Sequence, residues 1–184
     1  MIAREEALEL VKSNVANKNL INHMLAAEFI MRALAERFTQ DPEKWGLAGL
    51  LHDIDYDSTY TDMQKHSKVG AQMLKEAGVA EDICHAVLVH NDAHGVPRES
   101  MMDKALHAVD PLTGLIVAAA LVMPGKKLAS VTSEKILNRF KEKAFARGAN
   151  REQIKTCSDM GISLEEFVSI GLEAMQLRAA EIGL

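Results

Sequence analysis

Apolar residues recur at helical spacing along most of the chain, which predicts a fold built from helices. The longest such stretch covers residues 20–38, and another, residues 98–109, ends at Asp110-Pro111. Because a residue that precedes proline is disfavoured in the α region, we expect the chain to bend or restart at Asp110. In chain order, the remaining helices are expected over residues 3–13, 42–53, 66–76, 81–90, 133–143, 151–160 and 164–182.

Polar residues at the ends of these stretches agree with the helical prediction. Asp41 followed by Pro42 is typical of a helix start, and Ser163 with Glu166 is typical of a capping box. Residues 55–63 lie between two helical stretches and are predicted to form a loop. Because the sequence has no internal repeat and no low-complexity linker, the pattern predicts one compact helical bundle.

The composition also indicates an all-α fold. The chain has 184 residues, of which 48% are hydrophobic and only 4% aromatic, and it contains four prolines. This length and apolar content suffice for one core, and the scarcity of aromatic residues and proline favours helices packed on helices. We therefore expect a single all-α domain over residues 1–184.

Cysteine usage and the N-terminal residues bear on location. Cys84 and Cys157 are far apart and lack a Cys-x-x-Cys spacing, so neither a disulfide framework nor a thiolate zinc site is predicted. Charges in the first turn argue against a secretory signal. The apolar stretch 111–125 is interrupted by proline and glycine and is too short to span a bilayer. We expect a cytoplasmic protein without a membrane partner, and the sequence leaves the oligomeric state open.

The net charge of −5 is unevenly distributed along the chain. Residues 126–155 contain nine basic side chains and only three acidic ones. Lys126, Lys127 and Lys135 in this segment could clamp the phosphates of an anionic substrate, or they could belong to an ordinary solvated helix face. Because the rest of the chain is acidic, we do not expect broad nucleic-acid binding.

The main candidate chemistry is an ordered set of imidazoles and carboxylates: His23, His52, Asp53, His66, His90 and Asp110. The apolar run of residues 45–51 must be buried, and it delivers Asp53 toward the interior, where an unpaired carboxylate is costly. A divalent cation would meet that charge. Imidazole and carboxylate together accept manganese, iron, cobalt, nickel, zinc or magnesium, so the sequence leaves open which metal binds and whether one or two ions are held.

Asp110 and the acidic residues after position 52 also fit structural roles. Asp110 before a proline is a standard helix N-cap, and capping and ligation could coexist. The acidic residues after position 52 are spaced like a calcium loop, but Ser58 stands where glycine is required and Gln64 where glutamate is required. We therefore reject an EF-hand, and we leave Asp55 and Asp57 as residues that either orient a metal ligand or face solvent.

The ordered set resembles the signature of the HD superfamily of metal-dependent hydrolases, which consists of a lone histidine, a His-Asp doublet and a distal aspartate. The matching residues are His23, His52-Asp53 and Asp110. The resemblance spans about residues 18–121, which would form the motif-bearing core of an HD-type domain. The C-terminal helices, about residues 130–184, would pack on that core.

The resemblance also implies roles for individual residues. His66 to Ala71 is similar to the His-x-x-x-Gly-Ala stretch of members that hold two metals, and His90 falls where those members carry a further histidine. In members with one metal, comparable histidines contact phosphate or perform acid–base work, so both roles stay open. Asp53, His66 and His90 are the catalytic candidates. Apart from the resemblance, His94 lies in the loop with Asp92, where it is either a candidate for substrate contact or an ordinary surface histidine.

The chain departs from the family pattern in two places. The usual Gly-Lys after the doublet is replaced by Asp55-Tyr56-Asp57, which removes a lysine that could contact phosphate. Members that cleave cyclic dinucleotides carry a His-His-Glu stretch, where this chain has His90-Asn91-Asp92. The resemblance therefore does not imply cleavage of cyclic dinucleotides.

The resemblance implies a metal-dependent phosphohydrolase, in which metal-activated water attacks a small phosphate ester, such as a nucleotide or a related metabolite. A small phosphorylated molecule is therefore the expected partner, and nucleic acid is not. Two alternatives remain: a di-iron oxygenase of the same fold, because some HD-type enzymes use the same ligands for that chemistry, and a non-catalytic module that binds a nucleotide.

Overall fold

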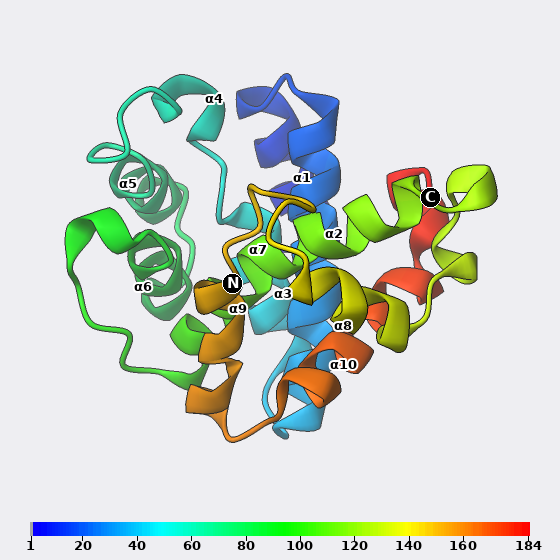
Figure 1. Ribbon diagram of the computed structural model, residues 1–184. Helices are drawn as coiled ribbons and strands as arrows, with labels where there is room; N and C mark the ends of the chain where they lie inside the picture. The colour runs from blue at the N-terminus through cyan, green and yellow to red at the C-terminus, as the bar shows by residue number, and fades with distance from the viewer. Residues whose placement is uncertain (1) are drawn as a thin grey trace.

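The computed structural model describes residues 2–184, and these residues form helices and connecting turns without a β-strand (Figure 1). The expectation of an all-α fold is confirmed. The α-helices are α1 (Arg4–Asn14), α2 (Lys18–Arg37), α3 (Pro42–Leu51), α4 (Tyr56–Thr59), α5 (Lys68–Glu76), α6 (Glu81–Val89), α7 (Met101–Leu121), α8 (Ser133–Lys141), α9 (Arg151–Lys155) and α10 (Leu164–Leu177). Short 3₁₀ segments are η1 (Asp92–His94), η2 (Pro124–Lys126), η3 (Leu128–Ser130), η4 (Thr156–Met160) and η5 (Ala179–Ile182).

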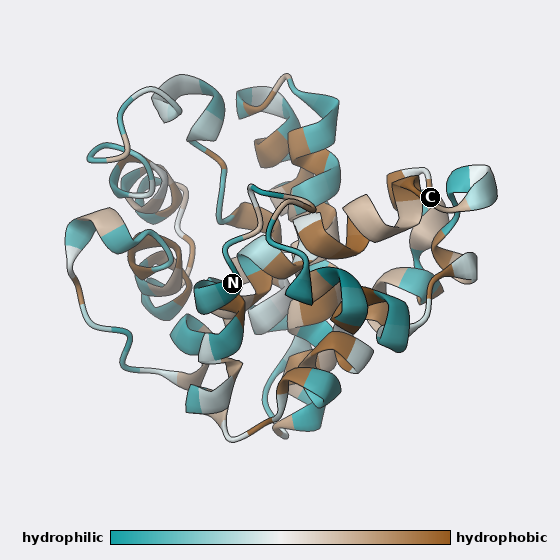
Figure 2. Ribbon diagram, viewed as in Figure 1, coloured by the Kyte–Doolittle hydropathy of each residue, from teal (hydrophilic) through white to brown (hydrophobic). Residues whose placement is uncertain are grey.

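Helices α2, α3 and α7 form the centre of the molecule, and the others cover them (Figure 1). The pair α5 and α6 lies on one side, where α6 contacts both α3 and α7, while α8 and α10 cover the opposite side. The apolar residues of α8 and α10 lie on one face of each helix, as the brown segments of Figure 2 show. Burial of these faces supplies the main driving force for assembly.

The most extensive helix contact joins α2 and α3 and depends on Gly49. A Cβ atom at position 49 would lie 2.7 Å from the backbone atoms of Ala27, so only glycine allows the two backbones to approach this closely. Helix α3 starts where the sequence predicts, because the Asp41 side chain accepts hydrogen bonds from the backbone N–H groups of Glu43 and Lys44. The close contact brings the end of α3, and hence the His-Asp doublet, against α2.

A buried ion pair fixes α1 against the same two helices. The Glu28 side chain is completely buried in α2 and accepts hydrogen bonds from Arg4 of α1, at 2.6 and 3.0 Å, and from Arg32, at 2.9 Å. Arg32 also donates to Glu43 of α3. Two guanidinium groups therefore compensate the buried carboxylate, which would otherwise be strongly destabilising.

Helix α7 contradicts the expected break at Asp110. It runs without interruption from Met101 to Leu121 with Pro111 inside it, and its N-cap is Ser100 rather than Asp110. Proline at position 111 cannot donate to the carbonyl of His107, and Gln153 of α9 replaces that donor through a 2.8 Å hydrogen bond from Nε2. The contact with α9 thus permits one continuous helix where the rule for a residue before proline predicts a break.

We expect Gln153→Leu to lower the free energy of unfolding by about 1–3 kcal/mol, because the buried His107 carbonyl would lose its donor. Pro111→Ala restores a backbone N–H for that carbonyl, so the same Gln153 substitution should cost much less in a Pro111→Ala background. Thermal or urea unfolding of the four variants measures this coupling. Equal costs of Gln153→Leu in both backgrounds would contradict this role of Gln153.

Other predicted boundaries are correct to within a few residues, and the differences have local causes. Residues 55–63, predicted as a loop, include the single turn α4. The capping box at Ser163 is only half formed: Ser163 accepts from the backbone N–H of Glu166, but the Glu166 side chain pairs with Arg37 instead. The chain from residue 164 onward stops being α-helical at Leu177 and continues as a 3₁₀ turn.

Helix α7 also bears on the expectation that the apolar stretch 111–125 is too short to span a bilayer. That stretch is not an isolated short segment, because its first eleven residues form the second half of a 21-residue helix. By length and composition α7 could cross a membrane, and 67% of its most apolar window is buried inside the fold. Core helices meet the same criteria when they are long.

Candidate metal centre

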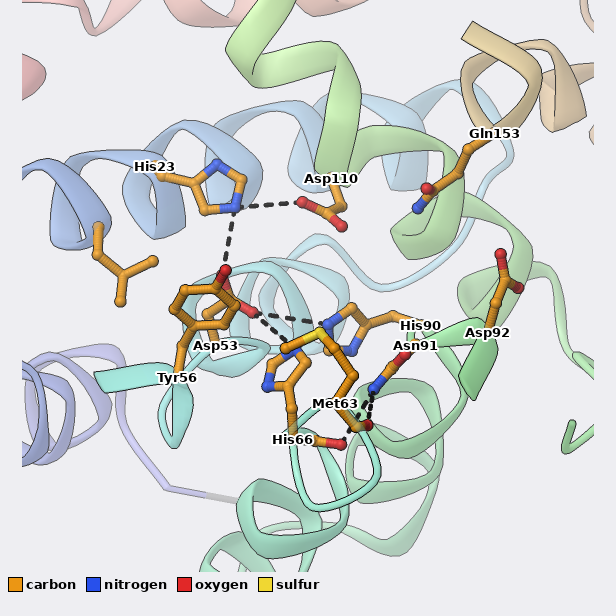
Figure 3. A pocket seen from close by; sticks show the side chains of 11 residues that line it. His23, Asp53, Tyr56, Met63, His66, His90, Asn91, Asp92, Asp110 and Gln153 are labelled. Atoms are coloured by element: carbon orange, nitrogen blue, oxygen red, sulfur yellow. Dashed lines mark hydrogen bonds and ion pairs between the residues drawn. The ribbon is translucent and has the colours of Figure 1, made fainter. Parts of the chain in front are cut away.

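Four histidines and two aspartates converge at one place between the central helices. Figure 3 shows five of them, namely His23, Asp53, His66, His90 and Asp110. They come from distant parts of the sequence and are carried by several helices or by the turns next to them. His23 lies on α2 and Asp110 on α7, the doublet follows α3, and His90 follows α6. His66 lies in the turn before α5. The structure therefore brings together all six residues predicted from the sequence as metal ligands.

Asp53 stands between two groups of imidazoles. Its Oδ2 lies 3.5 Å from His23 Nε2 and 3.4 Å from His52 Nε2. Its Oδ1 lies 3.4 Å from His66 Nε2 and 3.6 Å from His90 Nε2. The two oxygens of one carboxylate thus each face a separate pair of histidines.

Asp110 completes the first of these groups. Its Oδ1 lies 3.3 Å from His23 Nε2 and 3.9 Å from His52 Nε2. Metal bonds of about 2.0–2.2 Å at tetrahedral or octahedral angles place neighbouring donor atoms about 2.8–3.6 Å apart. The observed donor spacings are close to this range.

The hydrogen bonds of the four rings fix which nitrogen faces the centre. Nδ1 of His52 and Nδ1 of His90 donate to the carbonyls of Gly49 and Val87, and Nδ1 of His66 donates to a carboxylate oxygen of Asp55. Nδ1 of His23 donates to the Thr113 hydroxyl at 2.7 Å, because that hydroxyl donates its own proton to the Asp110 carbonyl. Nε2 is therefore the nitrogen left available for a metal in all four rings.

The orientation of these rings requires positive charge at the centre. Nε2 of His23 and Nε2 of His52 are only 3.0 Å apart, and two lone pairs cannot face each other at that distance without a proton or a cation between them. Nearby, Asp53 and Asp110 add two buried or half-buried carboxylates. The donor set therefore fits one or two divalent ions, with either His23, His52 and Asp110 or His52, Asp53 and His90 able to form a three-ligand group.

In the metal-free protein a proton partly replaces that charge. Burial lowers the pKa of His23, but the hydrogen bonds and charges of Asp110 and Asp53 outweigh burial and raise it to about 10. Burial and the neighbouring imidazoles lower the pKa of His52 to about 4. Burial opposes the charge on Asp53, yet the surrounding imidazoles hold the pKa of this carboxyl well below its usual value. Burial also lowers the pKa of His90, but the hydrogen bond and charge of Asp53 outweigh burial and raise it. The metal-free centre therefore holds two carboxylates and at least one imidazolium, that of His23, at neutral pH.

We expect divalent metal uptake to release about one proton per chain from His23 between pH 7 and 9, and the apparent affinity to rise about tenfold per pH unit in that range. The sign follows from the raised pKa: the proton stabilises the metal-free fold fully below the unfolded value near 6.5 and ceases to do so as pH passes about 10. Calorimetric titration with Mn²⁺ in buffers of different ionisation enthalpy measures the proton count. Uptake without proton release at pH 7 would contradict this assignment.

Asp55 supports the second group by orienting His66. Its side chain is buried, and Oδ1 accepts from His66 Nδ1 at 3.1 Å while Oδ2 accepts from the backbone N–H groups of Ser67 and Gly70, both at 2.9 Å. A Cβ atom at position 70 would lie 3.1 Å from Asp55 Oδ1, so glycine suits this position. The spacing from His66 to Gly70 therefore lets both residues contact the Asp55 carboxylate, which holds the His66 ring in place.

Asp57, the other acidic residue after the doublet, has a different role. Its Oδ2 accepts from the backbone N–H groups of Ala16 and Asn17, at 2.7 and 3.2 Å, and so ties the α4 turn to the start of α2. Of the two residues that the sequence left undecided, Asp55 orients a ligand and Asp57 holds the backbone.

An open cavity of about 430 Å³ leads from the surface to five of the six residues (Figure 3), whereas His52 is fully buried and does not line it. Besides the ligand candidates, its lining includes residues that the sequence did not point to, namely Leu20, Tyr56, Met63, Asn91, Asp92 and Gln153. Among these, Tyr56 packs edge to face on His66, with ring centroids 5.1 Å apart. Burial and the negative charges of Asp53 and Asp110 raise the pKa of Tyr56, so its hydroxyl remains a hydrogen-bond donor.

Two of these lining residues had a partial signal in the sequence. Tyr56 directly follows the Asp55 that replaces the family's Gly-Lys. Asn91 follows His90 and donates from Nδ2 to the carbonyls of Met63 and His66. Neighbours of a functional residue along the chain therefore line the cavity in both cases. Gln153 had no such signal, since it comes from a helix far along the chain.

The candidates for substrate contact lie elsewhere. His94 Nε2 donates to the His66 carbonyl at 2.7 Å, so this ring braces the turn behind His66 and is not among the residues that line the cavity. Lys126, Lys127 and Lys135 are also absent from that lining: Lys126 and Lys127 follow the far end of α7, and Lys135 borders a separate cavity with Met123. The structure does not bring these lysines to the ligand cluster.

Two further histidines make structural contacts. His107 donates from Nδ1 to the His90 carbonyl at 3.1 Å, which links α7 to the end of α6. His85 lies 3.2 Å from the buried Asp103 carboxylate. Neither residue lines the cavity, so both serve the packing of α6 and α7 rather than the ligand cluster.

The model of the HD domain family matches residues 20–120 of the chain, which include all six converging side chains. This protein belongs to the HD domain family. Proteins of this family bind divalent metals and are metal-dependent phosphohydrolases in general. The expected family, and with it the resemblance based on His23, His52-Asp53 and Asp110, is confirmed.

Curated relatives match the same region at low identity. The chain is 29% identical over 98 residues to ribonuclease Y of Oleidesulfovibrio alaskensis, covering 53% of this chain and 18% of that protein. It is 28% identical over 145 residues to ribonuclease Y of Lawsonia intracellularis and to that of Thermotoga petrophila, covering 73% of this chain and 26% and 27% of those proteins. The chain thus spans about a quarter or less of these relatives.

These matches overturn the expected partners. The expectation of a partner set without nucleic acid is wrong, because the curated relatives are named as ribonucleases. The exclusion of membranes is withdrawn with it, because these relatives extend far beyond the matched region and α7 meets the length and composition of a membrane span. Neither the overall acidic charge nor the stretch 111–125 excludes such partners.

Proposed function

We propose that this protein is a phosphohydrolase that uses two divalent ions held on either side of Asp53. The observation that carries the proposal is the arrangement of the Asp53 carboxylate, whose two oxygens each lie within 3.6 Å of the free nitrogens of two histidines. A carboxylate shared in this way suits two adjacent cations. His23, His52 and Asp110 would hold the first ion, and His66 and His90 the second.

When bound, such ions lower the pKa of water toward neutrality and neutralise charge on phosphoryl oxygens. The chain's own residues position the reaction. The carbonyls of Gly49 and Val87, the Thr113 hydroxyl and the Asp55 carboxylate keep each Nδ1 protonated, so every Nε2 stays available as a ligand. Tyr56 stands at the cavity wall with a protonated hydroxyl that can donate to a phosphoryl oxygen.

The charge of the cavity supports a metal-dependent role. Among the described residues, its lining contains Asp53, Asp92 and Asp110 but no lysine or arginine. In the metal-free state the positive charge of the lining would come from imidazolium such as that of His23, which already pairs with the Asp53 and Asp110 carboxylates, so little of it would be left for a phosphate ester. Binding of the substrate phosphate would thus depend on the ions, which would couple substrate affinity to metal loading.

The proposed substrate is a nucleoside phosphate, either as a free nucleotide or as part of an RNA chain. Hydrolysis of a small phosphate ester requires only the cavity, whose volume of about 430 Å³ lies in the range of small-molecule sites. RNA is included because the curated relatives are named ribonucleases. Both substrates present the same bond, a phosphate ester on ribose, to the Asp53 centre.

A hydrolysis assay on the purified protein, after loading with Mn²⁺, Mg²⁺, Co²⁺, Ni²⁺, Zn²⁺ or Fe²⁺, tests the proposal. Bis-p-nitrophenyl phosphate, nucleoside monophosphates and a short single-stranded RNA are the substrates. We expect product release that a chelator abolishes and re-addition of metal restores. Oxygen consumption by iron-loaded protein without hydrolysis would favour the oxygenase alternative, and nucleotide binding without turnover under every metal would favour the binding module.

A further inference from the structure

A second cavity adjoins the metal centre on the other side of His23. It is a groove of about 410 Å³ between α2 and α7, closed at one end by the C-terminal residues. Its lining is Asn19, Asn22, His23, Thr113, Gly114, Val117, Leu121, Ile182 and Leu184. Of these, only His23 also lines the catalytic cavity. A substrate held at the metal centre could therefore extend past His23 into the groove.

Helical spacing connects the groove to the ligands. Asp110, Gly114, Val117 and Leu121 stand three or four residues apart, so they share one face of α7. On α2, Asn19 and His23 are likewise four residues apart. With a rise of about 1.5 Å per residue, Gly114 lies about 6 Å and Val117 about 10 Å along the helix from Asp110. This is the distance scale that separates the phosphate of a nucleotide from its base.

The chemistry of the groove suits an uncharged ring with hydrogen-bonding edges. Among the described residues, no lysine, arginine, aspartate or glutamate side chain lines it, while Val117, Leu121 and Ile182 provide apolar surface. Asn22 donates from Nδ2 to the Ile182 carbonyl at 3.3 Å, which leaves its Oδ1 as an acceptor for a ligand. Asn19 adds a second amide at the exposed rim. Side-chain amides paired with apolar surface are a common means of holding a nucleobase.

Gly114 keeps the groove open. It lies inside α7, where glycine costs about 1 kcal/mol relative to alanine. A Cβ atom there would meet no heavy atom of the described chain within 4 Å, so packing within the protein does not require glycine at this position. By contrast, a Cβ atom at Gly171 would lie 2.9 Å from a methyl group of the buried Leu112 side chain, so glycine at that position serves helix packing. A larger residue at position 114 would project into open space next to Thr113 and Val117.

We infer that the groove between α2 and α7 is the subsite for the nucleoside part of the substrate and that Gly114 determines the size of the group it accepts. The ester phosphate lies at the Asp53 centre, and the ring lies over Gly114 and Val117 with its polar edge toward Asn22. This inference rests on the proposed function, because it takes the position of the phosphate from the metal centre.

The first test measures binding without chemistry. Adenosine and uridine lack phosphate, so their binding to the groove does not depend on metal or on turnover. In protein with labelled methyl groups, titration with either nucleoside should shift the NMR signals of Val117, Leu121 and Ile182. Gly114→Leu, which fills the groove with a good helix former, should weaken this binding by about tenfold or more. Gly148→Leu is the matched control, because a Cβ atom at position 148 also meets nothing within 4 Å and residue 148 does not line the groove.

The second test uses the metal-loaded protein with a nucleoside monophosphate and a short single-stranded RNA, which bring the same nucleoside to the phosphate. For each of these substrates that is hydrolysed, the KM of Gly114→Leu should be at least about tenfold higher than the KM of Gly148→Leu. Nucleoside shifts at the groove methyls without any hydrolysis would support the subsite and count against the proposed function. Absence of saturable shifts at these methyls, or equal binding by the two variants, would overturn the subsite whatever the hydrolysis assay shows.

Discussion

Asp53→Asn is expected to reduce the proposed metal-dependent hydrolysis by at least about 10³-fold and to lower the metal content of the purified protein from the proposed two ions to one or none. The reason is that one carboxylate serves both groups of histidines, with its Oδ2 near His23 and His52 and its Oδ1 near His66 and His90. An amide keeps the shape of the side chain but supplies neither the negative charge nor two anionic oxygens. Elemental analysis and initial rates measure both effects.

Asp57→Asn is the control for this substitution. Asp57 belongs to the same acidic stretch but binds the backbone N–H groups of Ala16 and Asn17 rather than the histidines. Metal content and rate should therefore stay close to those of the unsubstituted protein, with at most a modest loss of stability. An Asp53→Asn variant that retains both ions and full activity would show that the ions are held elsewhere.

His66→Gln should have the second largest effect, a loss of one ion with about a 10²-fold loss of activity. His66 Nε2 lies 3.4 Å from Asp53 Oδ1, on the side of the carboxylate away from His23 and His52. Glutamine preserves much of the side-chain volume but lacks the imidazole nitrogen, so the first ion should remain while the second is lost. Elemental analysis of protein purified without chelators gives the number of ions directly.

A substitution of Asp55, which holds the His66 ring, tests whether His66 binds a metal or only lies near the site. Asp55→Asn leaves the ring in place but weakens the hydrogen bond that orients Nδ1, so we expect metal affinity or activity to fall about 10- to 100-fold. His85→Gln, a change on α6 outside the cavity, should leave the metal content unchanged. If His66→Gln retained two ions, or if the unsubstituted protein bound only one, the assignment of a second ion to His66 and His90 would be wrong.

The helix boundaries show which contacts sequence rules describe well. Asp41 and Pro42 predict the start of α3 correctly, because the capping hydrogen bonds form within three residues. The rule for a residue before proline fails at Asp110, because Gln153, more than forty residues away, supplies the missing donor to the His107 carbonyl. Short-range hydrogen bonds are encoded in neighbouring residues, whereas compensation by a distant side chain is not.

The residues predicted to contact substrate show the same difference between what neighbouring residues encode and what packing decides. Lys126, Lys127 and Lys135 were predicted from charge and from their position along the chain, and the structure puts them away from the cavity. Gln153 lines the cavity although its sequence context gives no sign of it. Charge along the chain describes local composition, but the direction of each side chain depends on how α7, α8 and α9 pack.

The all-α fold, the family and the six converging residues could all be predicted from the amino-acid sequence, because helical periodicity and an ordered ligand motif are local properties of the chain. How these residues are used depends on packing. The close α2–α3 contact at Gly49 brings the doublet to His23, and the turn at Ser67 directs His66 toward Asp53. The groove beyond His23 likewise depends on α2, α7 and the C-terminal residues lying together. Distances between side chains on separate helices arise from packing, and no single segment of the sequence contains them.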